Sequence, residues 1–265
     1  MTVCIANICE EGKSVISASD RMVTAGFLAQ QFEHDKRKIY KITKNVVALT
    51  AGDATRSIEI FRAIQTKIDT SVEISVKQIA DLICEEYANL RNQKIDATYF
   101  RPRGMTRETF YKDYSKQLPQ ELAIFLDKAV HTEDLGLHLI VSGVDETDAH
   151  VFGITNPGKL ECYDTIGYHS IGIGSPHSLN SLIGRKSSTN DTLFTCVYNV
   201  YEAKKLAENA PGVGKNTDIV KISKDGLVFL SEEDIKILEN AYVKLNKPRK
   251  SNIEKELKEL SLFKK

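Results

Sequence analysis

Apolar and polar residues alternate along the first fifty positions in a pattern that predicts short strands joined by turns. The predicted strands cover 2–9, 14–19, 37–43 and 46–51, and polar residues at 10–13 mark the first turn. Strands that follow one another through turns in this way predict an antiparallel meander.

Helical spacing replaces this alternation after Gly52. The apolar positions that carry it are Ile58, Phe61, Ile64 and Ile68 in a first helix, then Ile79, Leu82, Ile83, Tyr87 and Leu90 in a second that begins near Val76. Residues 96–134 mix basic and aromatic side chains with short helical stretches separated by Pro119. We interpret this segment as a helical insertion within a domain that covers 1–246.

The second half of the chain repeats the same order of elements. Strands are predicted at 138–143, 149–154, 160–163 and 169–173, helices at 176–183 and 192–209, closing strands at 218–222 and 227–229, and a helix at 232–245. Strands, helices, strands and helices in this order predict an α+β fold, a four-layer αββα sandwich of two antiparallel sheets between two helical layers. Residues 247–265 form a charged tail in which Ile253, Leu257 and Leu260 predict an amphipathic helix.

Composition narrows the class of protein. The chain of 265 residues carries 36 basic and 36 acidic residues, so its net charge does not point to nucleic acid or a membrane surface. Its five cysteines are odd in number and lack CxxC spacing, which favours reduced thiols in the cytoplasm. No apolar stretch approaches a membrane span and no signal peptide precedes the first strand, so we expect a cytoplasmic protein.

Motifs for metals and cofactors fail when they are checked residue by residue. The six histidines show no paired ligand spacing, and we predict no metal site. The segment 212–217 is glycine-rich like a phosphate loop, but Asn209 replaces the first glycine and Asn216 replaces the required Ser or Thr. We therefore predict no cofactor.

Thr2 is the residue with the clearest chemical potential. Its small side chain permits removal of Met1, which would leave one residue with both a hydroxyl and a free α-amine. An α-amine has an unperturbed pKa of about 7.7 to 8, so it can accept the hydroxyl proton near neutral pH. Many chains begin Met-Thr without any catalytic role, and the remaining residues must carry the hypothesis.

Three further features follow Thr2 in order. Asp20 stands where the second predicted strand turns, in the segment Asp20-Arg21-Met22-Val23-Thr24. If residues 35–42 are extended, Lys36 and Lys38 lie on one face and Ile39 on the other. The run Ala51-Gly52-Asp53 leads a strand into a helix through a glycine, where a backbone N–H can meet an anion.

Together these features resemble the catalytic β subunits of the proteasome and the peptidase of the bacterial two-component proteasome-like protease. The resemblance spans nearly the whole chain, including 141–145, 150–154 and 171–176, and the closing hairpin at 218–226. It implies that Thr2 is the nucleophile, that Asp20 and Lys38 form a charged pair beside it, and that Gly52 supplies the oxyanion N–H. It also implies that the backbone of Thr24 pairs with an extended peptide substrate in a ring-like homo-oligomer, with any unfoldase partner unknown.

The same matching gives residues for the substrate pocket and two departures from the family. The pocket would be lined by Val23, Lys36, Tyr40, Thr50 and Ala54. An inward-facing Lys36 would favour an acidic or polar side chain. Ile173 occupies the place of the family's loop serine between Gly172 and Gly174, and Glu208 is the best match to an aspartate of the supporting residues.

Two alternatives to a threonine peptidase stay open on the sequence. The departures at Ile173 and after Glu208 are compatible with a catalytically weak or inactive proteasome-like scaffold or binding protein. The second alternative is a small-molecule amidase or an acyl-transfer enzyme with the same fold.

Overall fold

The computed structural model describes residues 2–25, 30–35, 37–68 and 74–246. The chain divides into two units, Met1–Phe229 and Leu230–Lys265. The described part of the second unit holds helix α7 (Glu232–Leu245), which begins after the N-cap Ser231 as the sequence predicts. The predicted tail helix at 247–265 lies outside the described residues.

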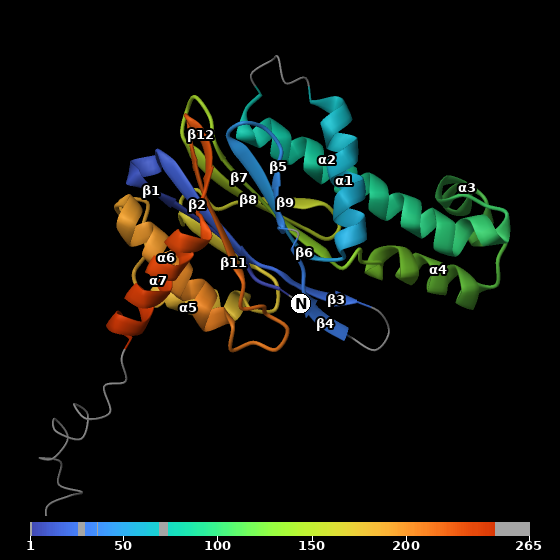
Figure 1. The fold of residues 1–265 in the computed structure, drawn as a ribbon. Coiled ribbons are helices and arrows are strands. Elements are labelled where there is room, and N and C mark those ends of the chain that lie inside the picture. The colour runs from blue at the N-terminus through green and yellow to red at the C-terminus, as the bar shows by residue number, and fades with distance from the viewer. Residues whose placement is uncertain (1, 26–29, 36, 69–73, 247–265) are drawn as a thin grey trace, which may run out of the picture. The chain divides into compact units, whose positions relative to one another are not determined.

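Two five-stranded antiparallel sheets form the centre of the first unit (Figure 1). The first sheet has the order β10-β1-β2-β11-β12. Its strands are β1 (Cys4–Cys9), β2 (Ser14–Asp20), β10 (Tyr168–Ile171), β11 (Thr217–Ser223) and β12 (Gly226–Phe229).

The second sheet has the order β5-β6-β7-β8-β9. Its strands are β5 (Ile39–Lys41), β6 (Val46–Gly52), β7 (Leu137–Val144), β8 (Ala149–Thr155) and β9 (Lys159–Cys162). A separate hairpin pairs β3 (Met22–Ala25) with β4 (Gln30–Glu33), and a short 3-10 turn, η1 (Glu10–Gly12), joins β1 to β2.

The prediction of a meander in the first fifty residues is wrong. β1 and β2 pair with each other, but β5 and β6 belong to the other sheet, and β10 crosses back to pair with β1. Alternating side chains identify a strand and its buried face, whereas partner choice depends on contacts far apart in sequence. The hairpin β3–β4 was also missed, because the sequence analysis predicted only a turn after the second strand, at Asp20.

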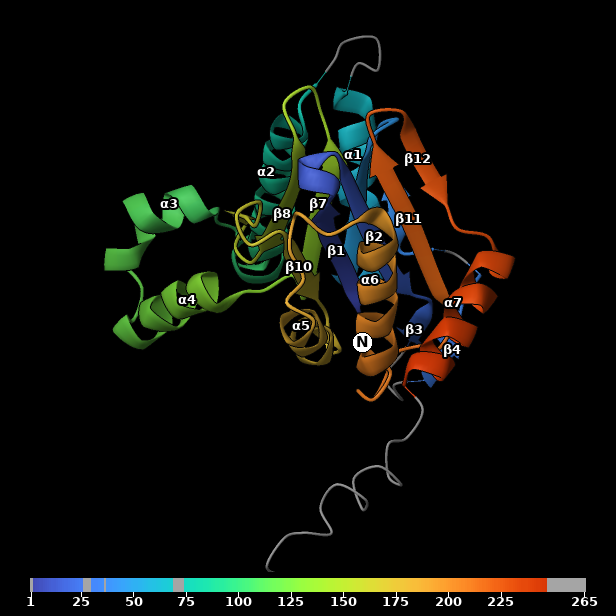
Figure 2. The same cartoon turned by 90° about the vertical axis from the view of Figure 1, so that its left-hand side faces the viewer.

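Helices pack against both sheets (Figures 1 and 2). α1 (Ala54–Lys67) and α2 (Val76–Ile95) share an apolar cluster with β6, β7 and β8. α5 (Ser175–Gly184) and α6 (Leu193–Ala207) contact β1, and α6 also contacts β2. A second apolar cluster holds side chains of both sheets, including Ile8 and Ile140. The prediction of a mixed α+β fold with two antiparallel sheets is confirmed.

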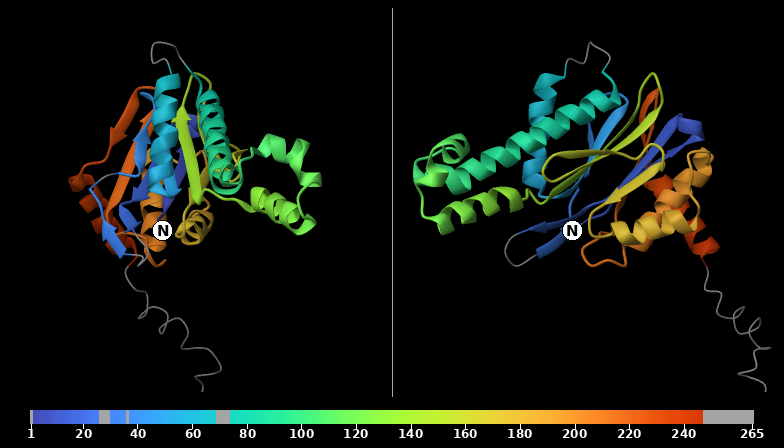
Figure 3. Two further views of the ribbon diagram at one scale, coloured as in Figure 1. Left: turned by 90° about the vertical axis from the view of Figure 1, so that its right-hand side faces the viewer. Right: turned by 180° about the vertical axis from the view of Figure 1, so that it is seen from behind.

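The segment 96–134 contains the predicted short helices and extends beyond the end of α2 (Figure 3). Its elements are η2 (Asp96–Phe100), η3 (Arg101–Arg103), α3 (Arg107–Lys112), η4 (Tyr114–Lys116) and α4 (Gln120–Thr132). Phe100, Phe110 and Leu126 form a small core of their own. The guanidinium of Arg91 on α2 donates to the carbonyls of Val130 (2.6 Å) and Glu133 (2.9 Å), which anchors the end of this segment.

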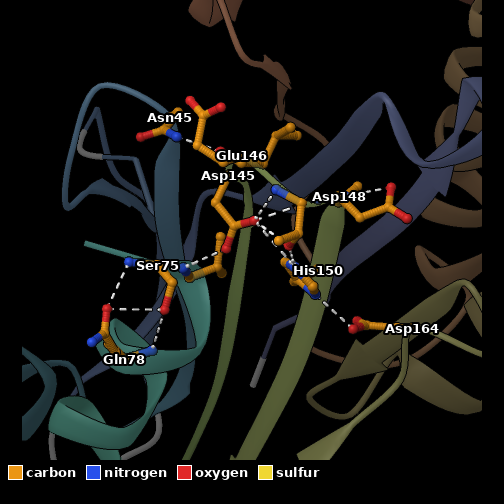
Figure 4. Close-up of polar contacts among 12 residues, drawn as sticks. Asn45, Ser75, Gln78, Asp145, Glu146, Asp148, His150 and Asp164 are labelled. Carbon is orange, nitrogen blue, oxygen red and sulfur yellow. Dashed lines mark hydrogen bonds and ion pairs between the residues drawn. The ribbon is translucent and has the colours of Figure 1, made fainter. Parts of the chain in front are cut away.

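Asp145 links the β7–β8 turn to the start of α2 (Figure 4). Its carboxylate accepts the backbone N–H groups of Val76 and Thr147, each at 3.0 Å. His150 lies between Asp145 and Asp164, with Nδ1 2.7 Å from Asp164 Oδ2. These contacts fix the end of β7 that is opposite to Leu137, the residue paired with Gly52.

A search of the described helices for one that combines the length and the apolar character of a membrane span found none.

Candidate active site

Thr2, Asp20 and Lys38 meet at one end of the two sheets. Thr2 lies two residues before the start of β1, Asp20 is the last residue of β2, and Lys38 directly precedes β5 of the other sheet. The hydroxyl of Thr2 donates to Asp20 Oδ1 and accepts from Lys38 Nζ. Lys38 Nζ also donates to the same carboxylate oxygen at 2.9 Å. Three residues that the sequence predicted as catalytic are therefore in mutual contact.

Asp20 is the centre of this group. Its side chain is fully buried, and a buried carboxylate is stable only where charges and hydrogen bonds satisfy it. Besides Thr2 and Lys38, it accepts the backbone N–H groups of Val3 (3.0 Å), Met22 (3.0 Å) and Gly214 (2.8 Å). Both oxygens are thus engaged, and the carboxylate is held in one orientation.

Gly214 belongs to a loop that follows α6, which the sequence analysis tested only as a phosphate loop. Its backbone N–H groups do bind anions, but the anions are carboxylates of this chain. Gly214 binds Asp20, while Lys215 and Asn216 donate to Glu33 at the end of β4. A Cβ at position 214 would lie 2.7 Å from Glu33 Oε1 and 3.0 Å from the backbone N of Met22, so a side chain there would displace Glu33 and crowd the backbone at Met22.

Lys204 anchors the same loop from the buried face of α6. Its side chain has no exposed surface, and its ammonium donates to Glu208 Oε1 (2.7 Å) and to the carbonyl of Lys215 (2.6 Å). Burial lowers the pKa of Lys204, and the nearby carboxylate of Glu208 opposes that shift. Glu208, which the sequence matched to a supporting aspartate, therefore acts through Lys204 on the loop.

Gly52 ends β6 with a φ of +116°, and Asp53 then caps α1 by accepting the N–H of Thr55 at 2.9 Å. A Cβ on Gly52 would lie 1.9 Å from the carbonyl oxygen of Gly136, so no other residue fits this turn. Gly52 lines the same cavity as Thr2. The structure thus places it beside the predicted nucleophile.

The loop 172–174 holds the backbone of Thr2. The N–H of Gly174 donates to the Thr2 carbonyl at 3.2 Å, and a Cβ on Gly172 would lie 2.3 Å from that oxygen. Ile173, where the resemblance would lead one to expect a serine, is 48% exposed and lines the cavity next to Thr2. The loop therefore positions Thr2 through its backbone and presents an apolar side chain in place of a hydroxyl.

The predicted substrate residues lie on β3, β5, β6 and α1. Tyr40 packs against Phe61 with ring centroids 4.7 Å apart, and burial raises its pKa. Thr50 is buried, and its carbonyl accepts from the Cys4 thiol at 3.3 Å. Val23 is half-buried, whereas Ala54 is exposed at the start of α1. Thr24 lies in β3 with its backbone opposite Gln31, and Lys36 lies outside the described residues.

A cavity of about 390 Å³ opens next to Thr2, with walls from β6, β7, β8 and β10. His138, Thr155, Tyr163 and His169 line it together with Gly52. None of the predicted pocket residues Val23, Tyr40, Thr50 and Ala54 is among the lining residues. Cys4, the first residue of β1, is buried close enough to Lys38 and Asp20 to interact with them electrostatically, and burial raises the pKa of its thiol to about 12. That thiol is therefore protonated at neutral pH and does not compete with Thr2 as a nucleophile.

Sequence reasoning missed Lys204, Gly214 and the cavity residues His138, Thr155, Tyr163 and His169. Lys204 lies one helical turn from Val200 and from Ala207, and a lysine among these apolar positions was a detectable signal. The glycines at 212 and 214 were noticed, but only as a failed nucleotide motif. No local signal joins His138 to His169, because they come from different sheets.

Comparisons of the chain with models of known protein families and with curated proteins found no match.

Proposed function

We propose that this protein is a threonine-type N-terminal nucleophile hydrolase that cleaves peptide or other amide bonds, with the four-layer αββα fold of the proteasome β class. The observation that carries the proposal is the contact of the Thr2 hydroxyl with both Lys38 and Asp20. A threonine hydroxyl that accepts from a lysine ammonium is placed to become an alkoxide, since the positive charge stabilises the anion.

The reaction requires that Thr2 be the first residue of the mature chain. Its free amine then accepts the hydroxyl proton as Oγ1 attacks the amide carbon, giving a tetrahedral intermediate. The resulting ammonium returns that proton to the leaving nitrogen, the C–N bond breaks, and an acyl ester remains on Thr2. Water, deprotonated by the same amine, hydrolyses the ester and regenerates the hydroxyl.

Lys38, Asp20 and Gly52 have separate roles in these steps. Lys38 stabilises negative charge on Oγ1, and Asp20 holds the ammonium in position beside that oxygen. The backbone N–H of Gly52 would donate to the oxyanion, a contribution of about 3 to 4 kcal/mol in other acyl-transfer enzymes. The position of Gly52 in the wall of the same cavity as Thr2 supports this assignment.

A non-catalytic scaffold is the second candidate, and Ile173 is the observation that favours it. The complete set of contacts around Asp20 favours catalysis instead, because a scaffold has no need for a buried carboxylate beside a lysine and a hydroxyl. A peptide substrate and a ring-like homo-oligomer belong to the proposal as well.

The test compares Lys38→Ala with Lys41→Ala, a change at an exposed lysine only three residues away. On a fluorogenic amide substrate, Lys38→Ala should lower kcat/KM by about a hundredfold or more, while Lys41→Ala stays near the wild type. Asp20→Asn should match Lys38→Ala, and the double variant should lose little more, since residues that act as a unit are not additive. Equal losses at Lys38 and Lys41 would refute the assignment.

A further inference from the structure

The cavity beside Thr2, which we call the Tyr163–His169 cavity, is lined by apolar, hydroxyl and aromatic side chains. Among its described lining residues there is no Asp, Glu, Lys or Arg. The side chains that give it its chemical character are His138, Thr155, Tyr163, His169 and Ile173. Its chemistry therefore differs from that of a pocket containing Lys36, which the sequence had suggested.

Tyr163 and His169 form a stacked pair in the wall, with ring centroids 3.8 Å apart and planes 17° from parallel. Gly153 on β8 makes room for them, because a Cβ there would lie 3.0 Å from the Tyr163 ring and 3.1 Å from His169 Nε2. The Tyr163 hydroxyl donates to Glu161 at 3.0 Å, which fixes the outer end of the ring. The pair thus presents a rigid aromatic surface.

The imidazole of His169 is neutral at physiological pH. Burial lowers its pKa to about 4, an effect that the Glu161 carboxylate opposes and His138 assists. Within the described part of the chain, the side chains of His138, His169 and Thr155 have no hydrogen-bond partner. Each can therefore offer a hydrogen-bond donor or acceptor to a bound group.

The position of the cavity indicates which part of a substrate it meets. An extended acyl chain is expected to run along β3, on the flank that carries Val23 and Thr24. The cavity instead has walls from β8 and β10, and Thr2 and Gly52 are its boundary with the reacting bond. A substrate group that enters the cavity would therefore lie on the leaving-group side of the attacked carbonyl, opposite to the acyl chain.

Resting on the proposed function, we propose that the Tyr163–His169 cavity binds the leaving-group side of the amide substrate and selects an uncharged apolar or aromatic side chain there. Stacking on the Tyr163–His169 pair and contact with Ile173 supply affinity. A carboxylate or ammonium is rejected because its water is removed without a charge partner in the wall.

The first arm of the test measures binding without turnover. The amides of phenylalanine, glycine, aspartate and lysine are titrated into the full-length Thr2→Ala variant and followed by ligand-observed NMR. Phenylalaninamide should bind at least about tenfold more tightly than the aspartate or lysine amide. Thr155→Asp in the same background should weaken the binding of phenylalaninamide and strengthen that of lysinamide. Thr155→Asn, whose side chain has a similar size but no charge, should keep the same order of affinities as Thr155.

The second arm measures turnover. Four peptides that share one acyl part and differ only in the first leaving-group residue are cleaved by the mature protein, with labelling of Thr2 by a small electrophile measured in parallel. The same order of preference is expected in kcat/KM. Labelling and cleavage without any leaving-group preference would overturn this inference and leave the proposed function standing. Selective binding of phenylalaninamide without any labelling of Thr2 would overturn the proposed function while the chemistry of the cavity holds.

Discussion

At the scale of single residues, Asp20 connects the chemistry to the rest of the molecule. It contacts Thr2 and Lys38 on one side and the Gly214 N–H on the other. Gly214 belongs to the loop after α6, and Lys204 anchors this loop by donating to the carbonyl of Lys215. Changes far from Thr2 in the sequence should therefore reach the nucleophile through the position of this one carboxylate.

Gly214→Ala should lower kcat/KM by about tenfold or more, since the added methyl group collides with Glu33 and Met22 and moves the N–H away from Asp20. Gly184→Ala is the matched control, because nothing lies within 4 Å of a Cβ at that position. Steady-state kinetics on one amide substrate measure both. If Gly214→Ala causes its full loss again in an Asp20→Asn background, the change does not act through Asp20.

The site could be predicted from sequence where its residues sit in local patterns. Alternation and glycine placement located Asp20 at a strand end and Gly52 at a strand-to-helix turn. The roles of Thr2, Asp20, Lys38 and Gly52 came from the order of these residues, which resembles that of the proteasome β subunits. Gly214 could not be assigned, because its role depends on an approach to Met22 and Glu33, about 180 to 190 residues away in sequence.

At the scale of elements, the β7–β8 turn is held to the start of α2 by charge. His150 lies between two carboxylates, and its hydrogen bond to Asp164 is the main cause of its raised pKa, with Asp145 adding to it. The pKa of Asp145 falls to about 2 despite partial burial, because Thr147 and the N–H of Val76 donate to it. The folded state therefore favours the imidazolium.

The contribution of His150 to stability should depend on pH in a defined direction. Since its folded pKa is raised, its stabilisation is fully present below the unfolded pKa of about 6.5 and is lost as pH rises through the folded value. Denaturant unfolding should thus show His150→Gln destabilised more at about pH 6 than at about pH 9. A constant difference between wild type and His150→Gln would contradict the account.

Strand positions could be predicted, but their pairing could not. The predicted strands at 46–51 and 149–154 match β6 and β8 within one residue, since apolar runs between turns mark them. Assignment of β5 and β6 to the second sheet depends on the pairing of Val46 with Gly143, across almost a hundred residues. A local sequence pattern does not predict a contact between residues that far apart.

At the scale of the whole molecule, the insertion at 96–134 is the leading candidate for contact with a second copy. α4 buries Leu126 in the small core of the segment and leaves Ile124 (59%) and Phe125 (53%) exposed. Adjacent exposed apolar residues of this size are typical of protein interfaces.

Replacing Ile124 and Phe125 with aspartate should reduce the molar mass measured by light scattering, if the proposed homo-oligomer uses this surface. Lys128→Asp changes charge on the same helix without removing apolar area, and should keep the assembly. Circular dichroism verifies that α4 still folds. An unchanged mass in a folded double variant would exclude this surface as the contact.

The central claim is that the mature protein begins at a reactive Thr2. Intact mass spectrometry of the natively expressed protein, before and after treatment with a peptide epoxyketone, tests it most directly. An epoxyketone forms a ring with both the hydroxyl and the amine of an N-terminal threonine, and the protonated Cys4 thiol behind the site should not react. The account predicts a chain without Met1 that gains one inhibitor, and no gain in Thr2→Ala. Retention of Met1, or an adduct that persists in Thr2→Ala, would contradict it.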